Sequence, residues 1–431
     1  MDLVKKKVEK PQRDFTKRQL SQWQKQRRKQ RIILGFGIFI IVAVLGIVGV
    51  GVYSKWYMAE YKPLRQTVIN VNDTEYNMDY YIKTLKVYGE GQPSYIMYYL
   101  ADEVVRFIEQ NELMRHGAME LGISISSDEV NGKLKSLGLP LEQPYKDIVG
   151  AELLVKKLLD EYFELEVPVS AEQRHIMAML LESESQAIEV RARLEDGESF
   201  ADIAGELSVE GVSKNEEGDL GWHPRDILTV MLGTPIPEEY AFESEVGVLS
   251  QPLYDETITK EVGYWLVKVL EREEESGDAH IQAILLGNQE EAQEVTAILE
   301  ASEDYDKDFA DLAKELSQHD ASKEDGGDLN WLPPGVMSST FDEFAFNAEI
   351  ELGTLSEPIR DDTVITKGGY WLLEVVDEDE DRQIEDDDRA SLKGKLLEEW
   401  VSGLWDDPEN KVESYLDDEK KEWAVERAIG G

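Results

Sequence analysis

Residues that could do covalent or metal chemistry are scarce in this chain. It has no cysteine, which excludes disulfides, thiolate metal sites, iron–sulfur clusters and a cysteine nucleophile. Its histidines are His116, His175, His223, His280 and His319. No HExxH motif joins any of them, so neither a metal nor another cofactor is expected. Ser208 and Ser317 lack a GxSxG motif and are expected to act as caps, so a hydrolase is the least favoured enzyme class.

Two of the histidines, His175 and His280, occupy equivalent places in an internal repeat. Both copies run from a His-Ile strand through an acidic helix, a Phe-Ala-Asp, a Leu-Ser and a Gly-Asp-Leu turn to a closing Gly-Tyr-Trp strand. The closing strands begin at Gly263 and Gly369, and the offset between the copies stays between 105 and 109 residues. This predicts two copies of one domain of about 100 residues. The mixture of strands and helices predicts an α+β fold, a small antiparallel sheet wrapped by helices.

Each copy resembles the parvulin family of peptidyl-prolyl isomerases. The resemblance is carried by the His-Ile of the first strand, the Gly-Asp-Leu turn, an Ala-Phe before a Gly-x-Leu-Ser-x-Pro segment, and the closing Gly-Tyr. It implies rotation of Xaa-Pro amides, whose barrier of about 18–20 kcal/mol reflects partial double-bond character. A catalyst of this rotation needs an apolar cup for the proline ring and a desolvated polar floor that favours the twisted amide.

Carried over residue by residue, the resemblance places the parvulin cup on two sets of side chains. In the second copy the set is Leu329, Met337, Phe341, Phe346 and Trp371. In the first copy it is Leu220, Leu228, Phe242 and Trp265, with Pro237 where the second copy has Phe341. The first copy thus lacks an aromatic wall, which favours the second copy as the active one. Met337 and Phe341 are also spaced like helix-core residues, so a structural role stays open.

The same resemblance implies polar candidates for the floor of each cup. They are His280, His319 and Asp320 in the second copy, and His175 and Glu210 in the first. Trp265 and Trp371 stand where the family has a second histidine, so the usual histidine pair is absent. A histidine on an apolar strand is often a satisfied core residue, and this alternative stays open for His175 and His280.

The N-terminal part of the chain has a different composition. Residues 1–31 form a basic segment with twelve Lys or Arg against three acidic residues, a net charge of +9 that leaves −54 for the rest. Residues 32–53 are an uncharged run of 22 residues, about 33 Å long as a helix, which predicts a transmembrane helix. The positive-inside rule predicts a cytoplasmic N-terminus and an extracytoplasmic location for residues 54–431. A cleaved signal peptide is the alternative, but the apolar run is long for one.

Residues 54–168 are expected to form a mostly helical module. Apolar residues recur at helical spacing from Ile96 to Met114, and Ser126 with Glu129 makes a capping-box pattern. The stretch from 111 to 127 resembles the N-terminal chaperone module of SurA- and PrsA-type secretion foldases. The two copies are expected at 169–273 and 277–378. Residues 379–431 are expected to form an acidic linker and C-terminal helices that return to the helical module.

Together these features predict a single-pass cell-membrane protein that folds secreted or envelope polypeptides and isomerises Xaa-Pro bonds in its second copy. Its expected partners are unfolded or newly translocated polypeptides and the lipid bilayer, whereas the −54 charge disfavours nucleic acid. One alternative is a holdase chaperone whose parvulin copies are inactive. The other is an acidic surface scaffold without catalysis, which binds folded partners.

Overall fold

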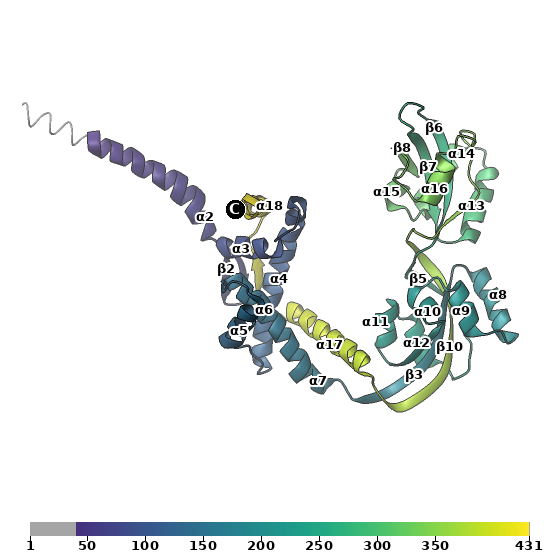
Figure 1. Ribbon diagram of the computed structural model, residues 1–431, viewed down its shortest axis with the longest axis horizontal. Coiled ribbons are helices and arrows are strands. Elements are labelled where there is room, and N and C mark those ends of the chain that lie inside the picture. Colours follow the sequence, from purple (N-terminus) through teal and green to yellow (C-terminus); the bar gives the residue numbers. More distant parts are fainter. Residues whose placement is uncertain (1–39, 431) are drawn as a thin grey trace, which may run out of the picture. The chain divides into compact units, whose positions relative to one another are not determined.

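The computed structural model describes residues 40–430, and the chain divides into two compact units. The first unit combines the chain up to Asp160 with the C-terminal segment from Glu398, and the second unit is Glu161–Leu397. The C-terminal segment therefore belongs to the same unit as the helical module near the N-terminus, as the sequence analysis expected. Figure 1 shows this as yellow elements among blue and purple ones.

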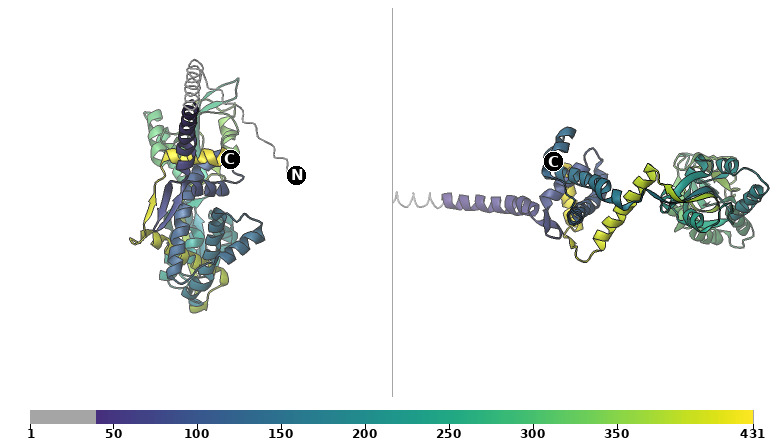
Figure 2. Two further views of the ribbon diagram at one scale, coloured as in Figure 1. Left: turned by 90° about the vertical axis from the view of Figure 1, so that its left-hand side faces the viewer. Right: turned by 90° about the horizontal axis from the view of Figure 1, so that it is seen from below.

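The first unit is mostly helical and has one small antiparallel sheet. Its elements are a helix at residues 40–52, η1 (Tyr53–Tyr61), α2 (Lys62–Leu64), β1 (Thr67–Val71), β2 (Thr74–Asn77), α3 (Met78–Tyr88), α4 (Ser94–Glu120), α5 (Ser127–Leu137), α6 (Gln143–Lys157), β11 (Val412–Ser414) and α18 (Asp418–Gly430). The sheet has the order β11-β1-β2, so a C-terminal strand pairs with an N-terminal one (Figure 2). α18 packs on α3 and α4, where Ala424 and Val425 are fully buried in the core.

Local capping explains where the helices of this unit begin. The expected capping box is confirmed: the Ser126 hydroxyl accepts from the Glu129 backbone N–H, and the Glu129 carboxylate accepts from the Ser126 N–H over 2.8 Å. These bonds satisfy N–H groups that have no partner within the helix. α3 begins in the same way, since the Asn77 side chain accepts from the Tyr80 N–H.

The expected transmembrane helix lies partly outside the described residues. Residues 1–31 and 32–39 are not among them, and the described part of the expected span is residues 40–53. Over residues 40–430, no helix is both long enough and apolar enough to cross a membrane.

The second unit contains two four-stranded antiparallel sheets wrapped by helices (Figure 1). The first domain is built from β3 (Ser170–Leu181), α8 (Glu184–Glu195), α9 (Phe200–Leu207), α10 (Gly211–Asn215), β4 (Asp219–Pro224), α11 (Ile227–Leu232), α12 (Ile236–Glu243), β5 (Leu253–Lys260) and β10 (Thr366–Gln383). The second domain is built from β6 (Gly263–Arg272), β7 (Ala279–Leu286), α13 (Gln289–Glu300), α14 (Tyr305–Leu316), α15 (Asp320–Lys323), β8 (Asp328–Leu332), α16 (Ser339–Ala345) and β9 (Ile359–Asp361). Their strand orders are β4-β3-β10-β5 and β8-β7-β6-β9. η2 (Leu158–Tyr162), α7 (Phe163–Glu166) and α17 (Asp386–Asp406) flank the unit boundaries.

The closing strand of each copy belongs to the sheet of the other copy. β6 closes the first copy but pairs with β7 and β9, and β10 closes the second copy but pairs with β3 and β5. This differs from the expected division into 169–273 and 277–378, in which each copy closes its own sheet. Both closing strands contain Gly-Tyr-Trp followed by a nearly continuous apolar run, so each fits either sheet. Pairing β6 with β7 also makes a hairpin, which requires less loop closure than pairing with a distant strand.

The two exchanging connections pass each other inside the second unit. The Thr366 hydroxyl, at the start of β10, donates to the Val262 carbonyl over 2.5 Å. At Gly263 an added Cβ would come within 2.7 Å of the Thr366 side chain and 2.8 Å of the Leu285 side chain. The glycine of the Gly-Tyr-Trp motif is therefore required by close packing at the crossing.

The acidic stretch after the second copy is only partly a linker. β10 continues to Gln383, which pairs with Ser170 at the start of β3, and α17 begins at Asp386. Residues 379–383 are therefore strand rather than linker. The reason is the length of β3, whose twelve residues offer β10 a partner well beyond its apolar part.

Candidate active site

An apolar cup lies on one face of the sheet of the second domain, under α16. Phe341 forms its fully buried base, and Leu329, Met337 and Phe346 are half-buried around it. Trp265 belongs to the same cluster and lies edge-on to Phe341, with ring centroids 5.1 Å apart. We call these five residues the second cup. The structure thus brings together Leu329, Met337, Phe341 and Phe346, as expected. The tryptophan of this cup is Trp265 and not the expected Trp371, because β6 and not β10 lies in this sheet.

A buried carboxylate fixes Trp265 in place. The indole Nε1–H donates to Asp361 Oδ2 over 3.1 Å, and the Ser338 hydroxyl donates to the same oxygen. Burial alone would raise the pKa of Asp361, but hydrogen bonds from Ser338, Thr363 and Trp265 outweigh it and hold the pKa below its usual range. Asp361 is therefore a charged anchor that serves β6 and the N-terminus of α16 together.

His319 borders the second cup. Its ring centroid is 5.3 Å from that of Trp265, in an edge-on arrangement, and its Nδ1 lies 2.8 Å from Ser322 Oγ. Burial lowers the pKa of His319, although the carboxylate of Asp320 opposes this, so the ring is neutral near pH 7. Asp320 itself is exposed at the first residue of α15.

The corresponding cup of the first domain is filled. Leu220, Leu228 and Phe242 are all buried, and Trp371 completes the cluster from β10. We call these four residues the first cup. α11 has no helical counterpart in the second domain and carries Leu228 into the cluster. Trp371 is anchored as Trp265 is, through a 3.1 Å hydrogen bond to Asp255 Oδ2.

Glu210 is committed to local structure. Its carboxylate oxygens accept from the backbone N–H groups of Val212 and Ser213, each over 2.7 Å, and so cap α10. Ser208 and Ser317 are the C-cap residues of α9 and α14, as expected. Their hydroxyls also bind the sheets: Ser208 Oγ accepts from the Leu180 N–H of β3, and Ser317 Oγ from the Leu285 N–H of β7. These side chains hold loops against the sheets.

His175 and His280 lie on the sheet faces opposite the cups, which corrects the expectation that they form the floors. Side chains alternate along a strand, and Ile281, next to His280, belongs to the cluster of the second cup. Likewise Ile176, next to His175, belongs to the cluster of the first cup. Each histidine pairs with an aspartate instead: His175 Nε2 lies 2.7 Å from Asp219 Oδ1 and His280 Nε2 lies 2.9 Å from Asp328 Oδ1.

Sequence reasoning missed the anchors of the two cups. Asp255 and Asp361 lie 106 residues apart, which is the offset of the closing strands, so the repeat itself contained the signal. Phe344 was also missed, although it packs against the cluster of the second cup from the same helix as Phe341. Its position three residues after Phe341 is the helical spacing that indicates a shared face.

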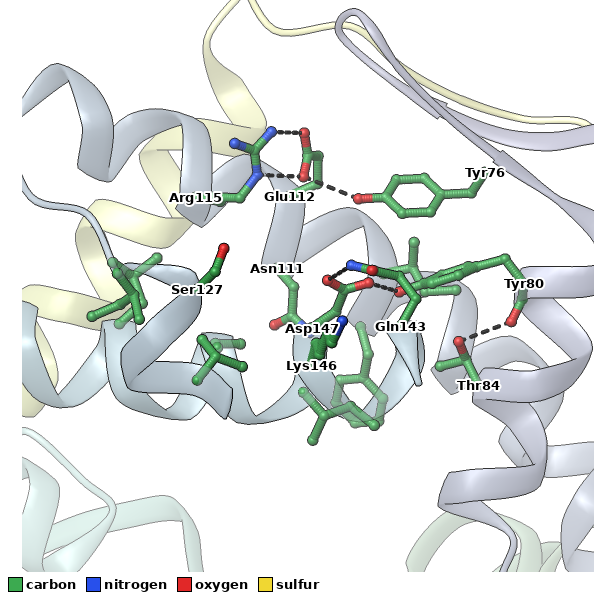
Figure 3. A pocket seen from close by; sticks show the side chains of 18 of the residues that line it. Tyr76, Tyr80, Thr84, Asn111, Glu112, Arg115, Ser127, Gln143, Lys146 and Asp147 are labelled. Carbon is green, nitrogen blue, oxygen red and sulfur yellow. Dashed lines mark hydrogen bonds and ion pairs between the residues drawn. The ribbon is translucent and has the colours of Figure 1, made fainter. Parts of the chain in front are cut away.

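A separate cavity lies in the first unit and has a volume of about 380 Å³. Figure 3 shows two tyrosines whose hydroxyls donate to carboxylates, Tyr76 to the buried Glu112 over 3.0 Å and Tyr80 to the half-buried Asp147 over 2.7 Å. Burial, with hydrogen bonds from Tyr80 opposing it, leaves the pKa of Asp147 raised. Phe107 lines the same cavity and is 37% exposed. The cavity therefore offers apolar walls and a few oriented polar groups, the usual character of a ligand site.

Known proteins resemble this chain in its middle part. Residues 175–271 and 264–378 each match a model of the PPIC-type PPIase domain. The chaperone SurA of Chromohalobacter salexigens is 27% identical over 233 residues, 51% of this chain and 49% of that protein. The foldase protein PrsA of Geobacillus kaustophilus is 38% identical over 96 residues, 22% of this chain and 30% of that protein. The crystal structure of PrsA from Bacillus subtilis aligns with 85% of this chain and 93% of its own, at 14% identity and a TM-score of 0.19.

The domain matches cover both sheets and both cups, so the chain carries two parvulin domains of the PPIC type. Over this part the chain is similar to the SurA chaperones and to the PrsA foldases. The chain spans about half the length of the SurA relative.

Proposed function

We propose that this protein is an extracytoplasmic foldase whose second domain isomerises Xaa-Pro bonds in unfolded polypeptides. The observation that carries the proposal is the contrast between the cups. Leu329, Met337 and Phe346 are half-exposed around Phe341, whereas the corresponding first cup is closed by α11. Only the second cup offers apolar side chains that a proline ring can reach.

The chemistry required of this cup is limited, because no covalent step is needed. A proline ring held against Met337 and Phe346, which are half-exposed, displaces water from the preceding amide. The planar amide owes its stability to a charge-separated resonance form, so dry, apolar surroundings favour the twisted amide relative to the planar one. A neutral His319 beside the cup adds no charge that would reverse this preference.

Met337→Ala tests the isomerase. Loss of the thioether contact with the ring is expected to lower kcat/KM for Xaa-Pro peptides about five- to tenfold, as measured with the full-length protein in mild detergent. The matched control is Met231→Ala, which removes a similarly half-buried methionine packed against the first cup. It should change kcat/KM less than twofold. Equal losses in both variants, or no acceleration by the wild type, would sink the proposal.

A holdase is the second candidate, and the cavity of the first unit favours it. Phe107 stacks on Tyr88 at the cavity wall, with ring centroids 5.1 Å apart. A holdase should suppress aggregation of an unfolded client, lose this effect in Phe107→Ser and retain it in Met337→Ala. An acidic scaffold without client binding would leave aggregation unchanged in every variant.

We further propose that residues 32–53 anchor the protein in the cell membrane with residues 1–31 in the cytoplasm, and that nucleic acid is no partner. Support comes from the helical residues 40–52, where Ile41, Leu45 and Ile47 are 60–73% exposed. The basic segment 1–31 precedes this run, as expected for an inward orientation. Alkaline washing of membranes should leave the protein in the pellet, and external protease should remove the part after the span. Release into the wash contradicts the anchor.

A further inference from the structure

We infer that Trp265 is the positioning residue of the second cup, so the isomerase site of the second domain is built from both copies. This inference rests on the proposed activity of that cup. Trp265 belongs to the first copy by sequence and to the second domain by strand pairing. It is 1% exposed, so it acts on the substrate through its neighbours rather than by contact.

Trp265 contacts Phe341, a residue of the second cup, and His319, which borders it. Its indole lies edge-on to Phe341, at 5.1 Å between centroids and 79° between planes. It also lies edge-on to His319, at 5.3 Å and 63°. Edge-to-face packing of this kind favours one ring orientation over others. The indole therefore sets the base of the cup and the imidazole beside it together.

The anchor of Trp265 extends its influence to α16. Asp361 accepts from the indole N–H and from the Ser338 hydroxyl, and Ser338 Oγ accepts in turn from the Phe341 N–H over 3.2 Å. Ser338 is the N-cap of α16, the helix that carries Phe341. A displaced indole thus moves Phe341 both through the ring contact and through the start of its helix.

The first domain supplies a matched control at Trp371. It is fully buried, and its indole N–H donates to Asp255 over 3.1 Å, as that of Trp265 does to Asp361. Replacing either tryptophan therefore removes similar packing and one similar hydrogen bond. Trp371 faces the filled cup, so only its contribution to stability should be lost.

The first experiment compares Trp265→Phe with Trp371→Phe in the full-length protein. Phenylalanine keeps an aromatic ring but loses the anchoring N–H. We expect similar falls in melting temperature for the two variants, a ten- to hundredfold loss of kcat/KM for Trp265→Phe, and less than a twofold loss for Trp371→Phe. A loss of activity in Trp371→Phe alone, or equal activities at equal stability, would overturn the inference.

A spectroscopic readout is independent of activity. The chain has five histidines, so their ring signals can be followed by NMR as the pH is changed. Burial lowers the pKa of His319, and Trp265 supplies one ring that buries it. The pKa of His319 should rise in Trp265→Phe and stay unchanged in Trp371→Phe. The reverse pattern, or no change in either variant, would contradict the role of Trp265.

Engineered disulfides test the exchange of strands by itself, because the chain has no cysteine of its own. Met177 and Glu374 are paired across β3 and β10, so Met177→Cys with Glu374→Cys should form a disulfide within one chain. The control combines Met177→Cys with Lys268→Cys, the equivalent position of β6, and should stay reduced. A disulfide in the control pair would mean that β6 pairs with β3, so that each copy closes its own sheet, and this would overturn the inference. If the wild type lacks isomerase activity, the proposed function fails, while the NMR and disulfide results still decide the placement of Trp265.

Discussion

At the scale of single residues, His223 is held by hydrogen bonds at both of its ring nitrogens. Its Nδ1 lies 2.8 Å from Asp388 Oδ2, and its Nε2 lies 2.7 Å from the Leu220 carbonyl oxygen. Both partners are acceptors, so the geometry favours the imidazolium form, in which both ring nitrogens carry protons. Burial alone would lower the pKa of His223, but Asp388, the Leu220 carbonyl and Glu385 together raise it above the ordinary value.

This raised pKa gives a pH-dependent contribution to stability. A group whose pKa is raised on folding stabilises the fold below its unfolded pKa, and the contribution is lost as the pH rises through the folded pKa. We expect His223→Gln to lower the free energy of unfolding by about 1–3 kcal/mol near a pH of about 6. The difference from wild type should shrink towards a pH of about 9. Urea unfolding across this range measures the difference, with His116→Gln, at a half-buried position, as control. A difference that grows with pH contradicts the assignment.

The other histidines show what residue type alone cannot tell. His175 and His280 follow the pattern expected of a first-strand histidine, yet a shift of one position along a strand decides which face a side chain occupies. His319, by contrast, borders its cup as expected, because its loop follows α14 directly into the cluster. Placement on a strand face is therefore the weakest step in reading catalytic residues from this sequence.

At the scale of elements, the closing strands depend on tight packing at the glycine of their Gly-Tyr-Trp segments. Gly263 and Gly369 begin the Gly-Tyr-Trp segments, and an added Cβ at Gly369 would come within 3.0 Å of the Leu180 side chain. At Gly263 the contacts are shorter, at 2.7–2.9 Å from three side chains. The motif is therefore a packing requirement of β6 and β10 rather than a flexible turn.

Gly263→Ala should consequently destabilise the second unit. We expect a loss of about 1–3 kcal/mol in the free energy of unfolding, because the crossing must open to admit the methyl group. Gly394→Ala is the control: Gly394 lies in α17 with open space around it, and alanine there should be neutral or stabilising by about 0.5–1 kcal/mol. Chemical denaturation monitored by tryptophan fluorescence gives both values. Equal stability of Gly263→Ala and wild type would show that the crossing is looser than described.

At the scale of the whole molecule, the first unit depends on segments from both ends of the described chain. Val425 of α18 is fully buried among residues of β1, α3 and α4. Val425→Ala should therefore lower the stability of this unit by about 1.5–3 kcal/mol, through lost burial and a residual cavity. Hydrogen exchange should show faster exchange in β1, α3 and α4, with the second unit unchanged. The exposed Ile429→Ala is the control, and unchanged exchange in Val425→Ala would contradict the shared core.

The sequence by itself determined the features that depend on local pattern. Its repeat predicted two α+β domains, its helical periodicities predicted the helical module, and its apolar residues at family positions predicted Leu329, Met337 and Phe341 as neighbours. The return of the C-terminal segment was also foreseen, because apolar stripes at Leu404 and Val425 required a partner. The repeat, the helical module and the return of the C-terminal segment follow from spacing and apolar pattern, which a chain carries within its own segments. The grouping of the cup residues follows from the resemblance to the parvulin family.

Only the tertiary structure decided which strand closes which sheet, which cup is open and which faces the histidines occupy. Two closing strands with one apolar pattern satisfy either sheet equally, so the pattern holds no information on the exchange. The filling of the first cup depends on α11, whose contribution appears only when Leu228 is packed against Trp371. These outcomes depend on contacts between distant segments. The free-energy difference between the alternative arrangements arises from those contacts and cannot be read from any one segment.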